Sequence, residues 1–156
     1  MVNKVENVDP REVQMLQHYL NEYGQQIEIF SQQFRMIEQG RLESLAAIET
    51  LSAITAIDAG DGTVLLQIGG GASVRAHVVE PERVLVSIGA EVTVERTSTD
   101  AIEFLKDRIT EMEASGKKVA ETIEKIRSQM DEISRRLDQV YRAAQQQAPQ
   151  GQSGTL

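Results

Sequence analysis

A single narrow apolar stripe runs along residues 101–144. Its members recur at steps of three and four residues, and Gly116 occupies the one stripe position that lacks an apolar side chain. A seven-residue repeat kept over this length is typical of a left-handed coiled coil, because a period of 3.5 residues keeps one stripe facing a partner helix. A helix with only a stripe to bury therefore needs a second helix. The stripe consists of Ile102, Leu105, Ile109, Met112, Val119, Ile123, Ile126, Met130, Ile133, Leu137 and Val140.

An earlier segment carries a matching stripe. Asp9 is a suitable helix cap and Pro10 suits the first helical position. The three–four spacing fails at Gly40 and Arg41, and turn residues at 58–62 end the helix near Ile57. The stripe before the break consists of Val13, Leu16, Leu20, Tyr23, Ile27, Phe30, Phe34 and Ile37.

The two stripes stay in phase if the helices pair antiparallel. In such a pair, facing residues have numbers with a constant sum, and both Leu20 with Leu137 and Ile27 with Met130 sum to 157. Two unrelated stripes would have no reason to keep this phase across the intervening segment. The sequence therefore predicts one antiparallel two-helix coiled coil.

Two glycines interrupt this pattern near its midpoint. Gly40 and Gly116 fall almost opposite each other in the predicted pairing. Glycine inside a helix costs about 1 kcal/mol relative to alanine. The pair is either a tolerated local stutter or a point where the helical arms bend.

Between the helices, residues 63–96 change to a two-residue period. An apolar face alternates with a polar one, as in half-buried antiparallel strands. Turn residues at 69–71, 80–82 and 89–90 divide this segment into two successive β-hairpins. The apolar face consists of Val64, Leu66, Ile68, Val74, Ala76, Val78, Val84, Val86, Ile88, Val92 and Val94.

This apolar strand face predicts oligomerisation. We expect the helical stripes to be used on each other, which leaves nothing in the chain to cover the strands, and open strand edges invite pairing with another chain. The predicted fold is α+β: a long antiparallel two-helix coiled coil whose helices are joined by two consecutive β-hairpins that form part of an intersubunit β-barrel. One structural domain is expected, with a leader (1–9), a helix (10–57), hairpins (58–98), a helix (99–144) and a disordered tail (145–156).

Composition excludes several classes of protein. A formal charge of −8 opposes nucleic-acid binding, which needs clustered Lys and Arg. The absence of Cys excludes disulfides and thiolate metal sites and favours a reducing compartment. The sequence contains no run of about 18 apolar residues, so no membrane span is predicted. We expect a cytoplasmic protein whose partners are other proteins.

No catalytic, cofactor or metal site is expected. The glycine-rich stretch 69–71 lacks the Lys-Ser/Thr ending of a phosphate loop and leads into a strand, so it is interpreted as a turn. His18 and His77 have no ligand partner three or four residues away. An enzyme is therefore not predicted.

The end of the helical pair that carries both chain termini has more apolar residues than a two-helix seam needs. Such an excess suits weak, adaptable contacts with apolar segments, although it is also compatible with a simply frayed end. The candidate contact residues are Val8, Val13, Met15, Leu16, Tyr19, Leu20, Val140, Tyr141 and Ala144.

The order helix, two hairpins, helix resembles the α class of the prefoldin family, most closely in its archaeal form. The most specific stretch runs from Thr63 through the glycine-rich turn to the Ile-Gly-Ala segment at 88–90, and the resemblance covers about residues 10–147. Two hairpins rather than one is similar to the α class and unlike the β class.

The resemblance implies a heterohexamer of two α and four β subunits, with the hairpins joined into β-barrels. It also implies an ATP-independent chaperone that holds non-native polypeptides at the coiled-coil tips and passes them to a group II chaperonin. The alternative is a coiled-coil scaffold that merely spaces other proteins. Holding of a denatured client without ATP discriminates between the two.

Overall fold

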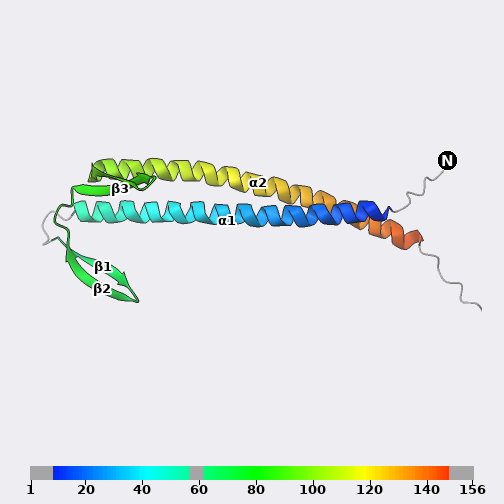
Figure 1. Ribbon diagram of the computed structural model, residues 1–156, viewed down its shortest axis with the longest axis horizontal. Helices are drawn as coiled ribbons and strands as arrows, with labels where there is room; N and C mark the ends of the chain where they lie inside the picture. The colour runs from blue at the N-terminus through cyan, green and yellow to red at the C-terminus, as the bar shows by residue number, and fades with distance from the viewer. Residues whose placement is uncertain (1–8, 57–61, 148–156) are drawn as a thin grey trace, which may run out of the picture. The chain divides into compact units, whose positions relative to one another are not determined.

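The computed structural model describes residues 9–56 and 62–147 (Figure 1). It confirms the predicted fold class, with two long helices flanking two antiparallel hairpins. The elements in chain order are α1 (Pro10–Thr55), β1 (Thr63–Gly69), β2 (Ala72–His77), β3 (Arg83–Gly89), β4 (Val92–Thr97) and α2 (Ser98–Gln147).

The helix ends differ from the predicted ones. Helix α1 ends at Thr55, and Ile57 lies outside the described residues. Helix α2 continues to Gln147, so residues 145–147 are helical and their assignment to the tail was wrong. The segment before Pro149 contains only Ala, Gln and Arg after Tyr141, all good helix formers, which explains the longer helix. The rest of the predicted leader and tail, residues 1–8 and 148–156, lies outside the described residues.

Side-chain caps fix both helix starts. The Asp9 Oδ1 accepts a hydrogen bond from the Arg11 amide at 2.9 Å. The Thr97 Oγ1 accepts one from the Asp100 amide at 3.2 Å, which satisfies an amide of the first turn of α2. The buried Ser98 donates from its hydroxyl to the Pro81 carbonyl at 2.7 Å. The start of α2 is thereby tied to the connection between β2 and β3.

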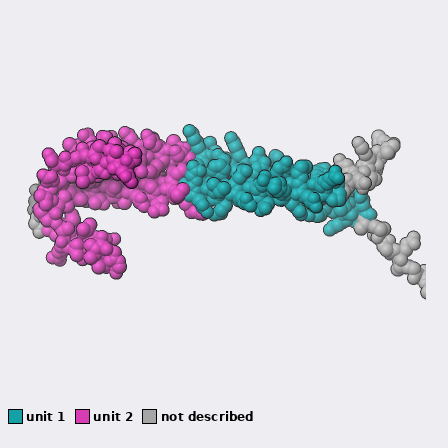
Figure 2. All heavy atoms as spheres, in the orientation of Figure 1, with its two compact units in different colours: residues 1–34, 118–156 teal, residues 35–117 magenta. Residues whose placement is uncertain are grey.

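The chain forms two compact units, coloured separately in Figure 2. Unit 1 comprises residues 1–34 and 118–156, and unit 2 comprises residues 35–117. Each unit therefore contains a segment of both helices, and unit 2 also contains the four strands.

In unit 1 the two helices pair antiparallel along the predicted seam. Gln17 donates a hydrogen bond to the Tyr141 hydroxyl at 3.0 Å. The constant sum of 157 predicts Val140 as the residue facing Gln17, which is one position from the observed partner. Every buried apolar residue of α2 in this unit is a predicted stripe member. These residues are Val119, Ile123, Ile126 and Val140.

In unit 2 the interruption of the seam is filled by polar contacts. Arg41 binds Glu38 in the same helix, with 2.9 Å between Nη2 and Oε2, and approaches Glu113 of α2 at 4.0 Å. The Arg41 hydrogen bond holds the pKa of Glu38 below its ordinary value. This ion pair is therefore kept above pH 4.5 and is lost as the pH falls through the lowered pKa.

Gly40, which the predicted pairing places almost opposite Gly116, is in contact with α2. A Cβ on Gly40 would lie 3.1 Å from Met112 Cε, so Met112 rather than Gly116 packs over Gly40. Gly116 is buried, and Ser44 donates to the Gly40 carbonyl at 2.8 Å. The question of a bend at Gly40 and Gly116 stays a hypothesis.

The two hairpins form separate two-stranded sheets and repeat each other at an interval of twenty residues. Leu66 pairs with Val74 in the first, and Val86 with Val94 in the second. Both carry a bulge at the same place, after Gln67 and after Ser87. Val78 lies one residue beyond β2, so its assignment to a strand was wrong.

The apolar face of β3–β4 is covered around Val86 by the chain's own helices, contrary to the prediction that nothing in the chain covers the strands. Val86 is only 8% exposed, and β3 shares an apolar groove with both helices. Small and aromatic residues outside the stripes provide part of this surface, which is why the seam pattern did not predict it. The helical residues along the groove include Ala47 and Leu51 of α1, and Ala101, Phe104 and Leu105 of α2.

We predict that Gly24→Ala raises the unfolding temperature of the assembled protein. A Cβ at Gly24 meets nothing within 4 Å, and alanine in a helix interior is favoured over glycine by about 1 kcal/mol. Circular dichroism at 222 nm during heating measures the change. Gly40→Ala is the matched control, with a smaller gain expected because Met112 must move. A lower unfolding temperature for Gly24→Ala would contradict this prediction.

Candidate functional site

The first candidate site is the terminal end of the coil, defined as residues 9–20 of α1 and 136–147 of α2, all in unit 1. Three of its predicted contact residues are well exposed: Met15 at 51%, Tyr19 at 42% and Tyr141 at 44%. Val140 is buried in the seam instead. Val13, Leu16, Leu20 and Ala144 are half-buried, and Val8 lies outside the described residues.

Polar bonds between the helices hold this end together. Arg136 Nε donates to Glu12 Oε1 at 2.8 Å, one turn away from the bond between Gln17 and Tyr141. The hydroxyl of Tyr141 is thereby engaged with α1, while its side chain keeps a large exposed fraction. At the terminal end, interhelical bonds therefore hold the seam together, and apolar side chains lie exposed outside the seam.

The terminal end can make only weak apolar contacts. Full burial of a Met or aromatic side chain contributes about 1.5–3 kcal/mol, and these three side chains are already partly covered. Methionine adapts to partners of different shape because it is unbranched and flexible. Such a surface suits transient binding of many different apolar segments.

The second candidate site is the apolar face of β1–β2. Leu66 is 54% exposed there, although its counterpart Val86 in β3–β4 is buried. Two further predicted strand residues of this hairpin, Ile68 and Val74, are exposed. The remaining predicted strand residues are Val64, Ala76, Val78, Val84 and Val94, which are half-buried, and Ile88 and Val92, which are exposed.

Sequence reasoning missed the opposite face of the hairpins. Leu65, paired with Arg75, is 72% exposed, and Leu85, paired with Glu95, is similarly exposed. Both lie within continuous apolar runs, Val-Leu-Leu and Val-Leu-Val, that depart from strict alternation. That departure is the signal by which these residues could have been found.

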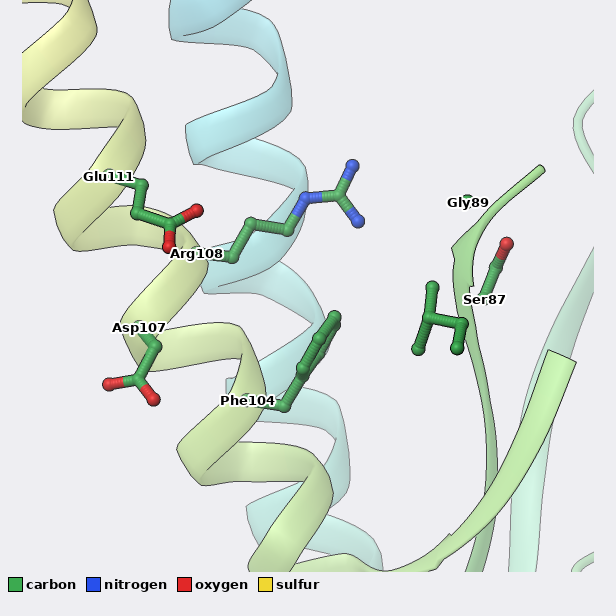
Figure 3. A pocket seen from close by; sticks show the side chains of 7 residues that line it. Ser87, Gly89, Phe104, Asp107, Arg108 and Glu111 are labelled. Atoms are coloured by element: carbon green, nitrogen blue, oxygen red, sulfur yellow. The ribbon is translucent and has the colours of Figure 1, made fainter. Parts of the chain in front are cut away.

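A pocket of about 440 Å³ lies between the end of β3 and α2. Figure 3 shows Phe104 and Arg108 extending from α2 towards β3. The Arg96 guanidinium lies 5.5 Å from the centre of the Phe104 ring, a cation–π distance. The pocket is open and its carboxylates, Asp107 and Glu111, lie on α2 one turn apart.

The described residues hold no cluster of three or more His, Asp or Glu side chains able to bind a metal ion. The glycine-rich stretch forms the turn of β1–β2, as predicted, and Gly69, Gly70 and Gly71 all have positive φ angles. Over residues 9–56 and 62–147, neither helix contains a segment long and apolar enough to cross a membrane.

These features define a class of protein: a two-helix coiled coil with two β-hairpins, which exposes apolar side chains on its strands and at its helix ends. A family model described as "Prefoldin subunit" matches residues 23–143. The chain belongs to the prefoldin family of chaperones, in its α class.

Archaeal relatives support this assignment over nearly the whole chain. "Prefoldin subunit alpha" of Methanoregula boonei is 61% identical over 137 residues, which covers 88% of each chain. The subunit of the same name from Methanoculleus marisnigri is 56% identical over 151 residues, which covers 97% of this chain and 99% of the relative.

Solved structures share the fold. Filamentous PFD from Methanocaldococcus jannaschii aligns with a TM-score of 0.62 at 20% identity, covering 74% of this chain and 95% of that one. The prefoldin beta subunit from Thermococcus strain KS-1 aligns with a TM-score of 0.56 at 18% identity, covering 86% and 95%. The chain thus shares the fold of solved prefoldin subunits.

We predict that Arg136→Gln increases amide hydrogen exchange in residues 137–144, with little change in the unfolding temperature. The bond to Glu12 joins two partly exposed side chains, and such pairs contribute about 0–1 kcal/mol to stability. Hydrogen exchange followed by mass spectrometry measures the change. Arg127→Gln is the control because its partner Glu124 lies in the same helix. Unchanged exchange in Arg136→Gln would show that the bond does not hold this end.

Proposed function

We propose that this chain is a holdase subunit that binds non-native polypeptides at the terminal end of its coil and prevents their aggregation without ATP. It assembles with β-class subunits as a heterohexamer of two α and four β chains in the cytoplasm. It then delivers its clients to a group II chaperonin.

The observation that carries this proposal is the exposure of Met15, Tyr19 and Tyr141 beside a closed seam. Apolar side chains of this size gain free energy when a client covers them. The interhelical bonds of Gln17 and Arg136 support the helix ends, so the exposed side chains are presented by a folded surface.

Binding through several ends supplies the strength that one end lacks. One end with about 2–4 kcal/mol of apolar contact binds only in the millimolar range or more weakly. Linking several such contacts to one client raises the effective concentration at each further end and increases avidity by about 10²–10⁴. Weak individual contacts also allow stepwise transfer to a chaperonin that competes for the same apolar segments.

Assembly through β1–β2 follows from its uncovered face. In β3–β4 the matching position, Val86, is packed on the chain's own helices, so β1–β2 is the hairpin with more apolar surface left for another subunit to cover. Each two-stranded sheet also has open edges that can continue into a barrel with other hairpins.

Changing Met15, Tyr19 and Tyr141 together to Ser should lower the protection of a denatured client by the hexamer several-fold. The exposed apolar contacts are lost, while the buried seam residues are unchanged. Light scattering after dilution of a denatured protein without ATP measures protection, and native mass spectrometry checks assembly. Leu42→Ser with Leu45→Ser is the control, because it removes exposed apolar side chains from unit 2. Equal protection by the triple variant and wild type would favour the scaffold function.

Leu66→Asp should prevent assembly with the β-class subunit, whereas Leu65→Asp should not. The two neighbours lie on opposite faces of β1, and only Leu66 lies on the face that we propose to be covered. A carboxylate buried without a partner costs several kcal/mol, which exceeds the contribution of one hairpin contact. Native mass spectrometry of co-expressed subunits measures the stoichiometry. Hexamers formed equally by both variants would contradict the proposed interface.

A further inference from the structure

The flanks of α1 in unit 1 differ in polarity. Relative to the seam, Met15, Tyr19 and Ile29 lie on one flank, and Ile29 is 63% exposed. Over the same length of α1, the flank on the other side of the seam carries Asn21 and Glu28, which are exposed. No sequence prediction used Ile29, because it lies outside the stripe.

Helix geometry places these three residues in one row. Ile29 is two heptads beyond Met15, so it occupies the same position in the repeat, and Tyr19 lies one turn from Met15. The rise of 1.5 Å per residue separates Tyr19 from Ile29 by roughly 15 Å along the helix. The residues exposed between them on this flank are Glu22 and Gln26.

We propose that this flank of α1 is a track for one extended segment of a non-native polypeptide, with Ile29 as a second anchor point beyond the terminal end. The inference rests on the proposed holdase function and extends it by naming the form and charge of the segment that is bound. The segment carries apolar side chains at both ends and a basic side chain between them.

The spacing of the anchors favours an extended chain over a packed helix. A helical partner needs an apolar residue at every three or four positions, and this flank has polar side chains at Glu22 and Gln26. An extended chain rises about 3.3 Å per residue and therefore spans the gap from Tyr19 to Ile29 with roughly five residues. The track begins at Met15 and Tyr19, the two exposed α1 residues of the terminal end.

The charge of the flank selects the residues between the anchors. Between Tyr19 and Ile29 this flank of α1 carries one charged side chain, Glu22, and no Lys or Arg. The exposed Glu22 carboxylate lies between the two anchor points, 3.3 Å from the His18 ring. A Lys or Arg between the apolar residues of the client can pair with it, whereas a Glu there is repelled.

The experiment compares three fluorescent peptides of one length on the assembled hexamer, using anisotropy. The first has two Leu anchors about five residues apart with Lys between them, the second has the same composition with adjacent Leu, and the third has Glu for Lys. We expect the first to bind about five- to tenfold more tightly than the second, as burial of one more apolar side chain predicts. The third should bind more weakly than the first, and the difference should shrink at high salt.

The variant Ile29→Ser should remove the preference for spaced anchors and leave binding of the second peptide unchanged. Asn21→Ser, on the opposite flank, is the matched control and should keep the preference. Equal binding of the first two peptides by wild type would overturn the track while leaving the terminal-end function to be judged by its own triple variant. Loss of the hexamer in Ile29→Ser, seen by native mass spectrometry, would also overturn it, because the flank would then be a subunit contact.

Discussion

The apolar seam between α1 and α2 is the interaction on which the rest of this structure depends. Away from the strands, neither helix has more than a stripe to bury, and a lone helix of that kind is not stable in water. Pairing removes Val119, Ile123, Ile126 and Val140 from solvent in unit 1 and Ile109 in unit 2. Every exposed surface discussed above consists of residues that this seam leaves unused.

The unused residues fall into two groups with different consequences. Near the strands, Ala47, Ala101 and Phe104 form a surface that receives β3–β4, which leaves β1–β2 as the uncovered copy of a repeated hairpin. At the terminal end, Met15, Tyr19 and Tyr141 are left exposed by the described residues. In the proposed function, one hairpin serves assembly and one helix end serves clients, so the two functions are separated along the chain.

The sequence predicted the features that have a period. The heptads predicted the antiparallel pairing, with Gln17 against Tyr141 one residue from the expected partner, and the alternation predicted both hairpins. It could not predict the docking of β3–β4, because alanines and one Phe outside a stripe give no periodic signal. It also grouped Val140 with Tyr141, although these neighbours point to the seam and to solvent, respectively. Only side-chain exposure separates a packing residue from a contact residue.

Site-specific photo-crosslinking tests most directly the central claim that the terminal end binds clients. A photoreactive amino acid would replace Tyr141 in the assembled hexamer, or Leu42 as a control position in unit 2 that is somewhat more exposed. The hexamer would then be mixed with a denatured client without ATP and irradiated. Strong crosslinks from position 141 and weak ones from position 42 are predicted. Equal crosslinking from both positions, or none from 141, would contradict client binding at the terminal end.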